Sequence, residues 1–243
     1  MKSSPKLRPN GWDALAAAAV LALAVACAAL FWTGGEEIGP LTAVVSANGE
    51  PVDRVVLAAE SDIPILGVVE PACAAAAAAT RNKRVGLIAT SASVRSGAYE
   101  RTLAAMDSTI TVYAGACPLF VPLVENGRFR PGDPVIETVA REYLEPLRAT
   151  GIDTLILGCT HYPLLTEIIA DIMGPGVTLI DSGAAAARVL RQTLSDRGAL
   201  AQRDHGTLTL YASDQPEDFG ALAGQFLRRP LESAVQHVDI ERY

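Results

Sequence analysis

One short stretch of the chain places a thiol and an imidazole close together. Cys159 stands two residues before His161 in a Gly-Cys-Thr-His-Tyr-Pro stretch that ends at Pro163. A thiolate removes protons and an imidazole titrates near neutral pH, so this pair suits acid–base chemistry. Pro163 is typical of the first turn of a helix, and the start of a helix favours a nearby thiolate. The alternative interpretation is a small thiol buried at the end of a strand.

The apolar pattern indicates which elements position this pair. Beyond Asp62, apolar runs of strand length alternate with helical stretches, and Cys159 follows directly on one of these runs. Such alternation is typical of a parallel sheet covered by helices on both faces, so we predict a doubly wound α/β lobe. In that fold, ligands bind beyond the carboxyl ends of the strands. The expected strands are residues 63–69, 84–89, 109–114, 154–157, 178–180 and 207–212. The expected helices are residues 72–80, 94–106, 135–150, 164–173, 184–195 and 217–227.

The amino-terminal part of the chain has a different texture. Residues 14–32, from Ala14 to Trp32, carry no charge, and their length suits a bilayer core of ~30 Å. Basic residues precede this stretch and acidic ones follow it, so the positive-inside rule predicts a cytoplasmic amino terminus and export of the rest. A buried alanine-rich helix and a cleaved signal peptide are the alternatives. We therefore predict a single membrane-anchor-like helix in residues 1–35, with membrane association through residues 14–32.

Residues 36–61 are predicted to form a β-hairpin and a junction. Two β-prone runs, at residues 44–45 and 52–56, flank Asn48 and Gly49, which is a strong hairpin signal. With the apolar stretch before it, this segment resembles the start of membrane-tethered proteins with a NusG domain II fold, over residues 1–57. The α/β region is then expected over residues 62–243.

Composition excludes several classes of protein. The chain has 243 residues, and 20 lysines and arginines against 27 acidic residues give a net charge of −7, without a basic stripe. A nucleic-acid partner is therefore not expected. The four cysteines (Cys27, Cys73, Cys117 and Cys159) are widely spaced and form no Cys-x-x-Cys pair. A disulfide framework or a metal site is therefore not expected either.

Five stretches of the chain, in the same order, resemble glutamate racemases of the aspartate/glutamate racemase superfamily. They are residues 62–71, 94–99, 116–125, 158–165 and 179–183. The Gly-Cys-Thr-His-Tyr-Pro-Leu-Leu stretch resembles the second active-site motif of these enzymes. The resemblance extends from about Asp62 to Asp239.

The resemblance implies a cofactor-independent racemase that uses two cysteines, one on each face of the glutamate α-carbon. Cys159 would be the acid or base for one face, and His161 would tune it or relay its proton. Thr160, together with His161, would bind the substrate carboxylate. D-Glutamate for peptidoglycan is the product that the family makes, in the cytoplasm. A homodimer is an alternative to a single chain.

The chain also departs from the family pattern. Glutamate racemases begin with a strand and Asp-Ser-Gly, and a later strand ends in Cys-Asn-Thr, which supplies the opposite cysteine. This chain has neither, because residues 44–57 stand where Cys-Asn-Thr is expected, and a join is expected near residues 58–61. We therefore expect a truncated first lobe and impaired racemisation. An aspartate racemase is one alternative, and a non-catalytic, membrane-tethered remnant that binds a dicarboxylate or a protein partner is the other.

Four further positions are candidate site residues. Cys117 lies in a family stretch, but its apolar neighbours indicate packing, and Cys73 is expected to be buried at the start of a helix. Glu125 faces the cleft or solvates a helix end. Ser182, before Gly183, either binds an anion at a helix start or forms a plain strand-to-helix turn.

Overall fold

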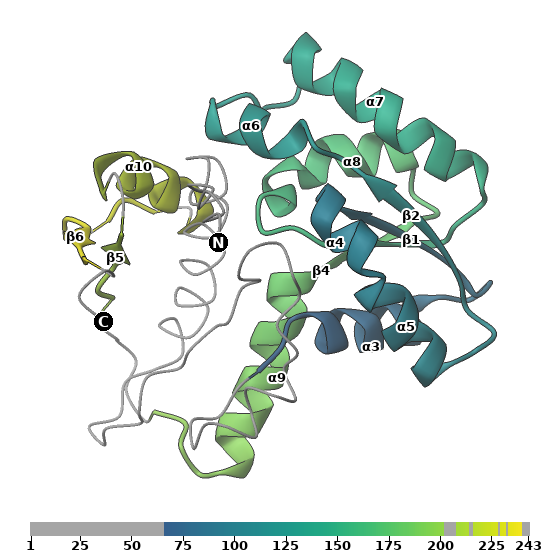
Figure 1. Cartoon of the computed structure of the whole chain (residues 1–243), viewed down its shortest axis with the longest axis horizontal. Helices are drawn as coiled ribbons and strands as arrows, with labels where there is room; N and C mark the ends of the chain where they lie inside the picture. Colours follow the sequence, from purple (N-terminus) through teal and green to yellow (C-terminus); the bar gives the residue numbers. More distant parts are fainter. Residues whose placement is uncertain (1–65, 202–207, 214–215, 228, 232, 240–243) are drawn as a thin grey trace, which may run out of the picture.

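The structure is a computed structural model that describes residues 66–201, 208–213, 216–227, 229–231 and 233–239. Its centre is a four-stranded sheet with the order β2-β1-β3-β4 (Figure 1). The strands are β1 (Arg84–Ala89), β2 (Thr111–Ala116), β3 (Thr154–Leu157) and β4 (Thr178–Asp181). All three pairings are parallel. The predicted parallel α/β lobe is therefore confirmed.

Helices cover both faces of the sheet, as a doubly wound fold requires (Figure 1). Helices α3 (Val69–Ala79) and α5 (Ala98–Met106) pack on one face, and α9 (Ser182–Asp196) lies against α3. Helices α7 (Pro134–Ala149) and α8 (Thr166–Met173) pack on the other face, beside the short α6 (Phe120–Glu125).

Alternating side chains of the central strands feed the two cores. In β3, Ile156 joins the core under α3 and α5, whereas Leu155 and Leu157 join the core under α7 and α8. This alternation is the two-residue period of a strand whose faces are both buried. Gly86 of β1 is closely approached by Ile152, because a Cβ there would lie 2.3 Å from Cδ1 of that side chain and would force it to move. The sheet therefore forms from apolar runs with a glycine at a close approach.

Some of the predicted elements were wrong in their bounds. The helix expected over residues 94–106 is two helices, α4 (Ser91–Ser96) and α5, because Gly97 between them has a left-handed φ of 60°. The strand expected over residues 63–69 is not a strand at residues 66–68, and α3 begins at Val69. Pro71 suits the first turn of that helix and the alanines after it favour helix.

Two short segments, the helix α6 and a 3₁₀ turn, also differ from expectation. The short helix α6 was not predicted, since Pro122 lies inside it and its six residues show no full helical period. A 3₁₀ turn, η1 (Tyr162–Leu165), precedes α8 and contains Pro163. The helix expected from residue 164 therefore begins as this turn.

A smaller unit follows the lobe in the chain. It contains α10 (Pro216–Leu227) and a parallel pair of two-residue strands, β5 (Tyr211–Ala212) and β6 (Gln236–His237). Only Tyr211 and Ala212 of the strand expected at residues 207–212 are in β5. The predicted apolar helix and β-hairpin, and the boundaries of residues 1–35 and 36–61, lie outside the described residues and stay predictions. No helix in the described part of the chain is long and apolar enough to cross a membrane.

Candidate functional site

The site lies where the chain order of the strands reverses. Strand β1 has β2 on one side and β3 on the other, so the crevice beyond the carboxyl ends of β1 and β3 is the switch point of the sheet. Ile88 and Leu157 are partners near these ends, and Thr90 and Cys159 follow them in the chain. The structure therefore brings a hydroxyl and a thiol to the position where this fold binds ligands.

Gly158 fixes the direction in which the chain leaves β3. Its N–H donates to the carbonyl oxygen of Ile88 at 2.8 Å, which continues the pairing with β1 by one residue. A Cβ on Gly158 would lie 2.9 Å from Cδ1 of Leu87 and 3.0 Å from the same carbonyl oxygen. A side chain here would force its neighbours to shift, so glycine is favoured, and Cys159 begins its turn directly against β1.

Three side chains form a connected line at this point. The Sγ atom of Cys159 lies 4.0 Å from Nδ1 of His161, and Oγ1 of Thr160 lies 3.2 Å from the same nitrogen. On the other side of the ring, Nε2 of His161 lies 3.1 Å from Oε1 of Glu125. A carboxylate only accepts hydrogen bonds, so Nε2 is the donor. The arrangement is thiol, imidazole and carboxylate in series.

The environment of His161 favours the protonated imidazole. The residue is 2% exposed, and this burial acts to lower its pKa. Hydrogen bonds and charge interactions with Cys159 and Glu125 act in the opposite direction and prevail, so the pKa is raised from 6.5 to about 9. At neutral pH the ring therefore carries a positive charge between a thiol and a carboxylate, which is a suitable setting for proton transfer.

Aromatic packing holds the carboxylate and the imidazole together. Tyr162, the residue after His161, is fully buried, and its hydroxyl donates to the carbonyl oxygen of Cys117 at 3.0 Å. The ring of Tyr162 meets Phe120 of α6 edge to face, with centroids 5.3 Å apart. Glu125 is the last residue of the same short helix. The packing therefore sets the distance between Glu125 and His161.

The other described cysteines are unsuited to acid–base work. Burial raises the pKa of the Cys117 thiol to about 12, and Cys159 adds to this. Burial raises the pKa of Cys73 to about 12 as well, with contributions from Glu100 and Glu70. Cys159 is partly buried at the edge of the core, so it differs from both. Among the described residues there is no second accessible thiol to oppose Cys159, and Cys27 lies outside them.

The remaining predicted positions resolve differently. The sequence left open whether Glu125 faces the cleft or solvates a helix end. In the structure its carboxylate accepts a hydrogen bond from His161. The Oγ atom of Ser182 donates to the carbonyl oxygen of Leu157 at 2.9 Å, and Asp181 accepts from the N–H of Ala184, so these side chains serve the strand-to-helix turn. No group of three or more residues suited to a metal occurs in the described ranges.

Sequence reasoning missed one pair at the switch point. The hydroxyls of Thr90 and Ser93 lie 3.0 Å apart directly after β1, and Thr90 caps α4 by accepting from the N–H of Ser93. The available signal was a threonine and serines immediately behind an apolar strand, since that position faces the ligand crevice in this fold.

Comparisons with known proteins identify the family to which this chain is similar. The family model described as Asp/Glu/Hydantoin racemase matches residues 37–190. The glutamate racemase of Desulforudis audaxviator is 42% identical over 181 residues, which cover 72% of this chain and 66% of the relative. Glutamate racemase isoform RacE1 from Bacillus anthracis matches with a TM-score of 0.70 at 33% identity, over 76% of this chain and 68% of that one. Glutamate racemase from Francisella tularensis, in complex with D-glutamate, matches with a TM-score of 0.68 at 31% identity, over 78% and 69%.

These matches confirm the resemblance to glutamate racemases and also show its extent. The chain spans about two thirds of the length of the curated relatives that it matches. The range of the family match begins at residue 37, so it includes residues 37–61, for which the sequence pattern predicts a hairpin and a junction.

Proposed function

Because the chain belongs to the Asp/Glu/Hydantoin racemase family, we propose that it is a glutamate racemase-type protein in which Cys159 exchanges the α-proton of glutamate on one face. The observation that carries the proposal is the line of Cys159, His161 and Glu125 at the switch point of the sheet. The relative from Francisella tularensis, solved with D-glutamate, supports glutamate as the substrate. The role that this substrate implies, and that we include in the proposal, is the supply of D-glutamate for peptidoglycan.

The proton transfer follows from the roles that each group can fill. The Cys159 thiolate takes the proton from the α-carbon, and the electron pair of that C–H bond stays on the α-carbon and spreads into the α-carboxylate. The positively charged His161 ring beside the sulfur supports the thiolate before the transfer and can hold a proton during it. Glu125 keeps the ring in place by accepting from Nε2. Thr160 and Thr90 supply hydroxyl groups for a substrate carboxylate at the same edge.

Return of the proton decides whether the centre inverts. The same thiol can deliver a proton or a deuteron only to the face from which it took one. Inversion requires a second acid on the opposite face, and among the described residues the other two thiols are buried. Loss of one positioned acid typically lowers a rate by roughly 10²–10⁴-fold. We therefore infer slow exchange with little or no racemisation.

Deuterium exchange tests this proposal. L-Glutamate and D-glutamate are incubated separately with the protein in D₂O, and α-deuterium is measured by mass spectrometry while the enantiomers are separated by chiral chromatography. We expect slow deuterium uptake into one enantiomer without measurable formation of the other. Cys159→Ala should abolish the uptake, whereas Cys73→Ala, which changes a buried thiol elsewhere in the lobe, should retain it. Uptake at the unaltered rate in Cys159→Ala would refute the proposal.

Racemisation at a rate ordinary for enzymes, on the order of 1–10³ per second, would contradict the single-face part of the proposal. It would mean that a second acid is supplied by residues outside the described ranges or by another chain. Aspartate in the same assay measures the preference for glutamate, and equal exchange of both would contradict glutamate specificity.

We also propose that residues 14–32 associate the chain with membranes. The support is the uncharged stretch between flanking charges of opposite sign. The full-length chain should sediment with membranes after lysis without detergent, and a variant without residues 1–40 should move to the soluble fraction. Equal distribution of the two chains would contradict this.

A further inference from the structure

An aromatic ring from outside the four-stranded lobe packs on the imidazole of the site. Phe226 lies in the last turn of α10, and its ring meets the ring of His161 edge to face, with centroids 5.5 Å apart and an interplanar angle of 88°. This geometry is one that aromatic rings favour, because the positive edge of one ring faces the negative face of the other. Helix α10 belongs to the unit after the lobe (Figure 1). A segment remote in sequence therefore reaches the proton-transfer line.

The contact adds an aromatic neighbour to the polar partners of the imidazole. One nitrogen faces Cys159 and Thr160, the other donates to Glu125, and Phe226 packs against the ring. The side chain of His161 is only 3% exposed although its ring carries a charge at neutral pH. A buried charge that keeps its hydrogen bonds interacts more strongly with its partner when water is kept away from both.

On the basis of the proposed function, we propose that Phe226 is a positioning residue, whose ring holds the His161 imidazole between Cys159 and Glu125 and keeps water from the bond between His161 and Glu125. Phe226 acts through His161 and is not itself a catalytic residue. An imidazole can turn about its bond to Cβ, and such a turn would exchange the positions of its nitrogen and carbon atoms. A ring packed against the imidazole, with centroids 5.5 Å apart, hinders that turn.

The same contact gives the unit after the lobe a role in the site. Glu125 reaches His161 from α6, whose position depends on packing within the lobe, and Phe226 reaches it from α10. The imidazole is therefore held from two separate parts of the chain. Displacement of α10 would free one side of the ring while leaving the hydrogen-bond partners in place. The proposal thus predicts that the exchange of the His161 Nε2 proton with solvent depends on the contact with α10.

The test is the exchange of that proton with solvent. In the full chain with ¹⁵N-labelled histidine at pH 7, the Nε2–H signal of His161 is identified by its loss in His161→Gln. We expect the wild-type proton to be protected from solvent, and Phe226→Ala to exchange it at least about tenfold faster, since opening of the cover becomes easier. Phe226→Leu, which keeps an apolar side chain but no ring, should lie between the two.

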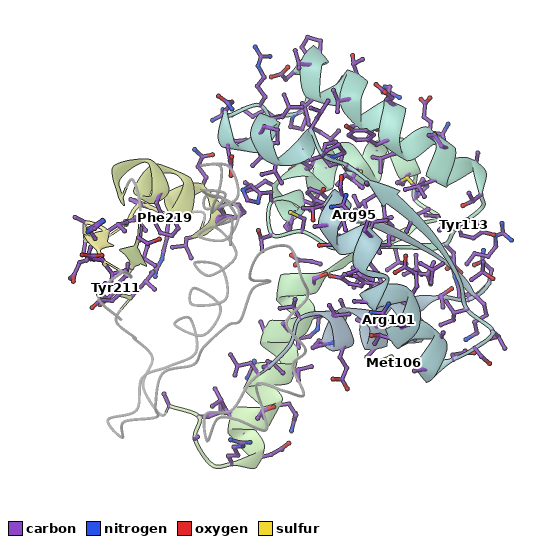
Figure 2. The ribbon with its side chains drawn as sticks, viewed as in Figure 1. Arg95, Arg101, Met106, Tyr113, Tyr211 and Phe219 are labelled. Carbon is purple, nitrogen blue, oxygen red and sulfur yellow. The ribbon has the colours of Figure 1, made fainter. Side chains whose placement is uncertain are left out.

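The matched control is Phe219→Ala, which removes a phenyl ring from the same helix two turns before Phe226. Figure 2 labels Phe219 on the unit that contains α10. We expect it to leave the protection of the His161 proton unchanged, which separates a local effect of Phe226 from general loosening of α10. Circular dichroism establishes that each variant is folded. Should Phe226→Ala fail to fold, Phe226→Leu carries the test.

Unchanged protection of the His161 proton in a folded Phe226→Ala or Phe226→Leu would overturn the proposal, and so would equal loss in Phe219→Ala. The readout does not depend on turnover. Protection that depends on Phe226 without any deuterium uptake into glutamate would leave the positioning role standing and refute the proposed function. Uptake that depends on Cys159, with protection independent of Phe226, would do the reverse.

Discussion

The two ends of strand β3 carry polar groups that differ in how fully their hydrogen bonds are satisfied. Before the strand, the carboxylate of Asp153 accepts from the hydroxyl of Thr80 at 2.7 Å and from the N–H groups of Arg81 and Asn82 at 2.7 and 2.8 Å. The hydroxyl of Thr154 adds a fourth bond at 3.0 Å. After the strand, the thiol of Cys159 has its nearest polar partner 4.0 Å away.

This difference separates stability from chemistry within one short strand. The hydrogen bonds of Asp153 join the loop before β1 to the start of β3. Burial acts to raise the pKa of this carboxyl, but the hydrogen bonds prevail and lower it to about 2. Cys159 has no such set of close partners and stands at the ligand edge of the sheet. A stable lobe with a reactive site requires polar groups with satisfied hydrogen bonds at the amino edge of the sheet. At the carboxyl edge it requires a reactive group without close hydrogen-bond partners.

The largest expected effect is a difference in thiol reactivity. With a pKa of about 12, Cys73 and Cys117 hold about one thiolate in 10⁴ at pH 8, and both are buried. Cys159 is partly exposed beside a charged imidazole. We expect iodoacetamide to alkylate Cys159 at least about 10³-fold faster, as measured by peptide mass mapping over time. Similar rates for the three thiols would remove the contrast between Cys159 and the core.

A change at the amino edge should affect stability and leave the thiol alone. Asp153→Ala leaves the Thr80 hydroxyl and two backbone N–H groups without their acceptor, and hydrogen bonds to a charged group are worth about 1.5–3 kcal/mol each. We expect the free energy of unfolding in urea to fall by about 3 kcal/mol, with the alkylation rate of Cys159 unchanged in the folded protein. An altered alkylation rate would mean that the two edges are coupled.

The same carboxylate predicts how stability depends on acid. Its folded pKa, near 2, is below the ordinary value of 3.8, so its contribution is present above pH 3.8 and is lost as the pH falls towards 2. The variant without this carboxylate should therefore lose less stability between pH 5 and 2 than the wild type does. Parallel curves for the two proteins would contradict the assignment.

A smaller effect is expected at the glycine that leads to the thiol. In Gly158→Ala the new Cβ meets Leu87 and the carbonyl of Ile88, so the backbone must shift, at a cost of about 2 kcal/mol. The alkylation rate of Cys159 should change as well, because its turn begins there. Gly176→Ala is the matched control, since nothing lies within 4 Å of a Cβ at that position. Equal stability of the two variants would contradict the close approach.

Sequence reasoning was most accurate where the apolar pattern was uninterrupted. Residues 84–89 and 154–157 were predicted with the bounds that β1 and β3 have, since both are compact runs that are buried on both faces. The break at Gly97 was missed, because a helical period continues across it and only the left-handed backbone ends the first helix. Local pattern therefore determined these two central strands well, but it failed where the strand expected over residues 63–69 gives way to α3.

The site was predictable only in part. The motif indicated Cys159 and His161 as candidates, which the structure places side by side, and the apolar neighbours of Cys117 correctly indicated packing. The partner of His161 was not predictable, because Glu125 is 36 residues away and its approach depends on the packing of Phe120 against Tyr162. The contact with Phe226 depends in the same way on where α10 docks. Such contacts are set by tertiary packing and leave no local pattern.

The central claim is that Cys159, His161 and Glu125 act as one unit, and the pH dependence of Cys159 alkylation tests it most directly. The pKa of His161 is raised, so the favourable interactions of its charged ring are fully present below pH 6.5 and are lost as the pH rises through about 9. The wild-type alkylation rate should therefore change its dependence on pH near pH 9, where the positive charge of the ring beside the thiol is lost. Glu125→Gln removes one of the groups that raise the pKa of His161, so this change should occur at lower pH. Superimposable profiles of wild type and Glu125→Gln would contradict the account.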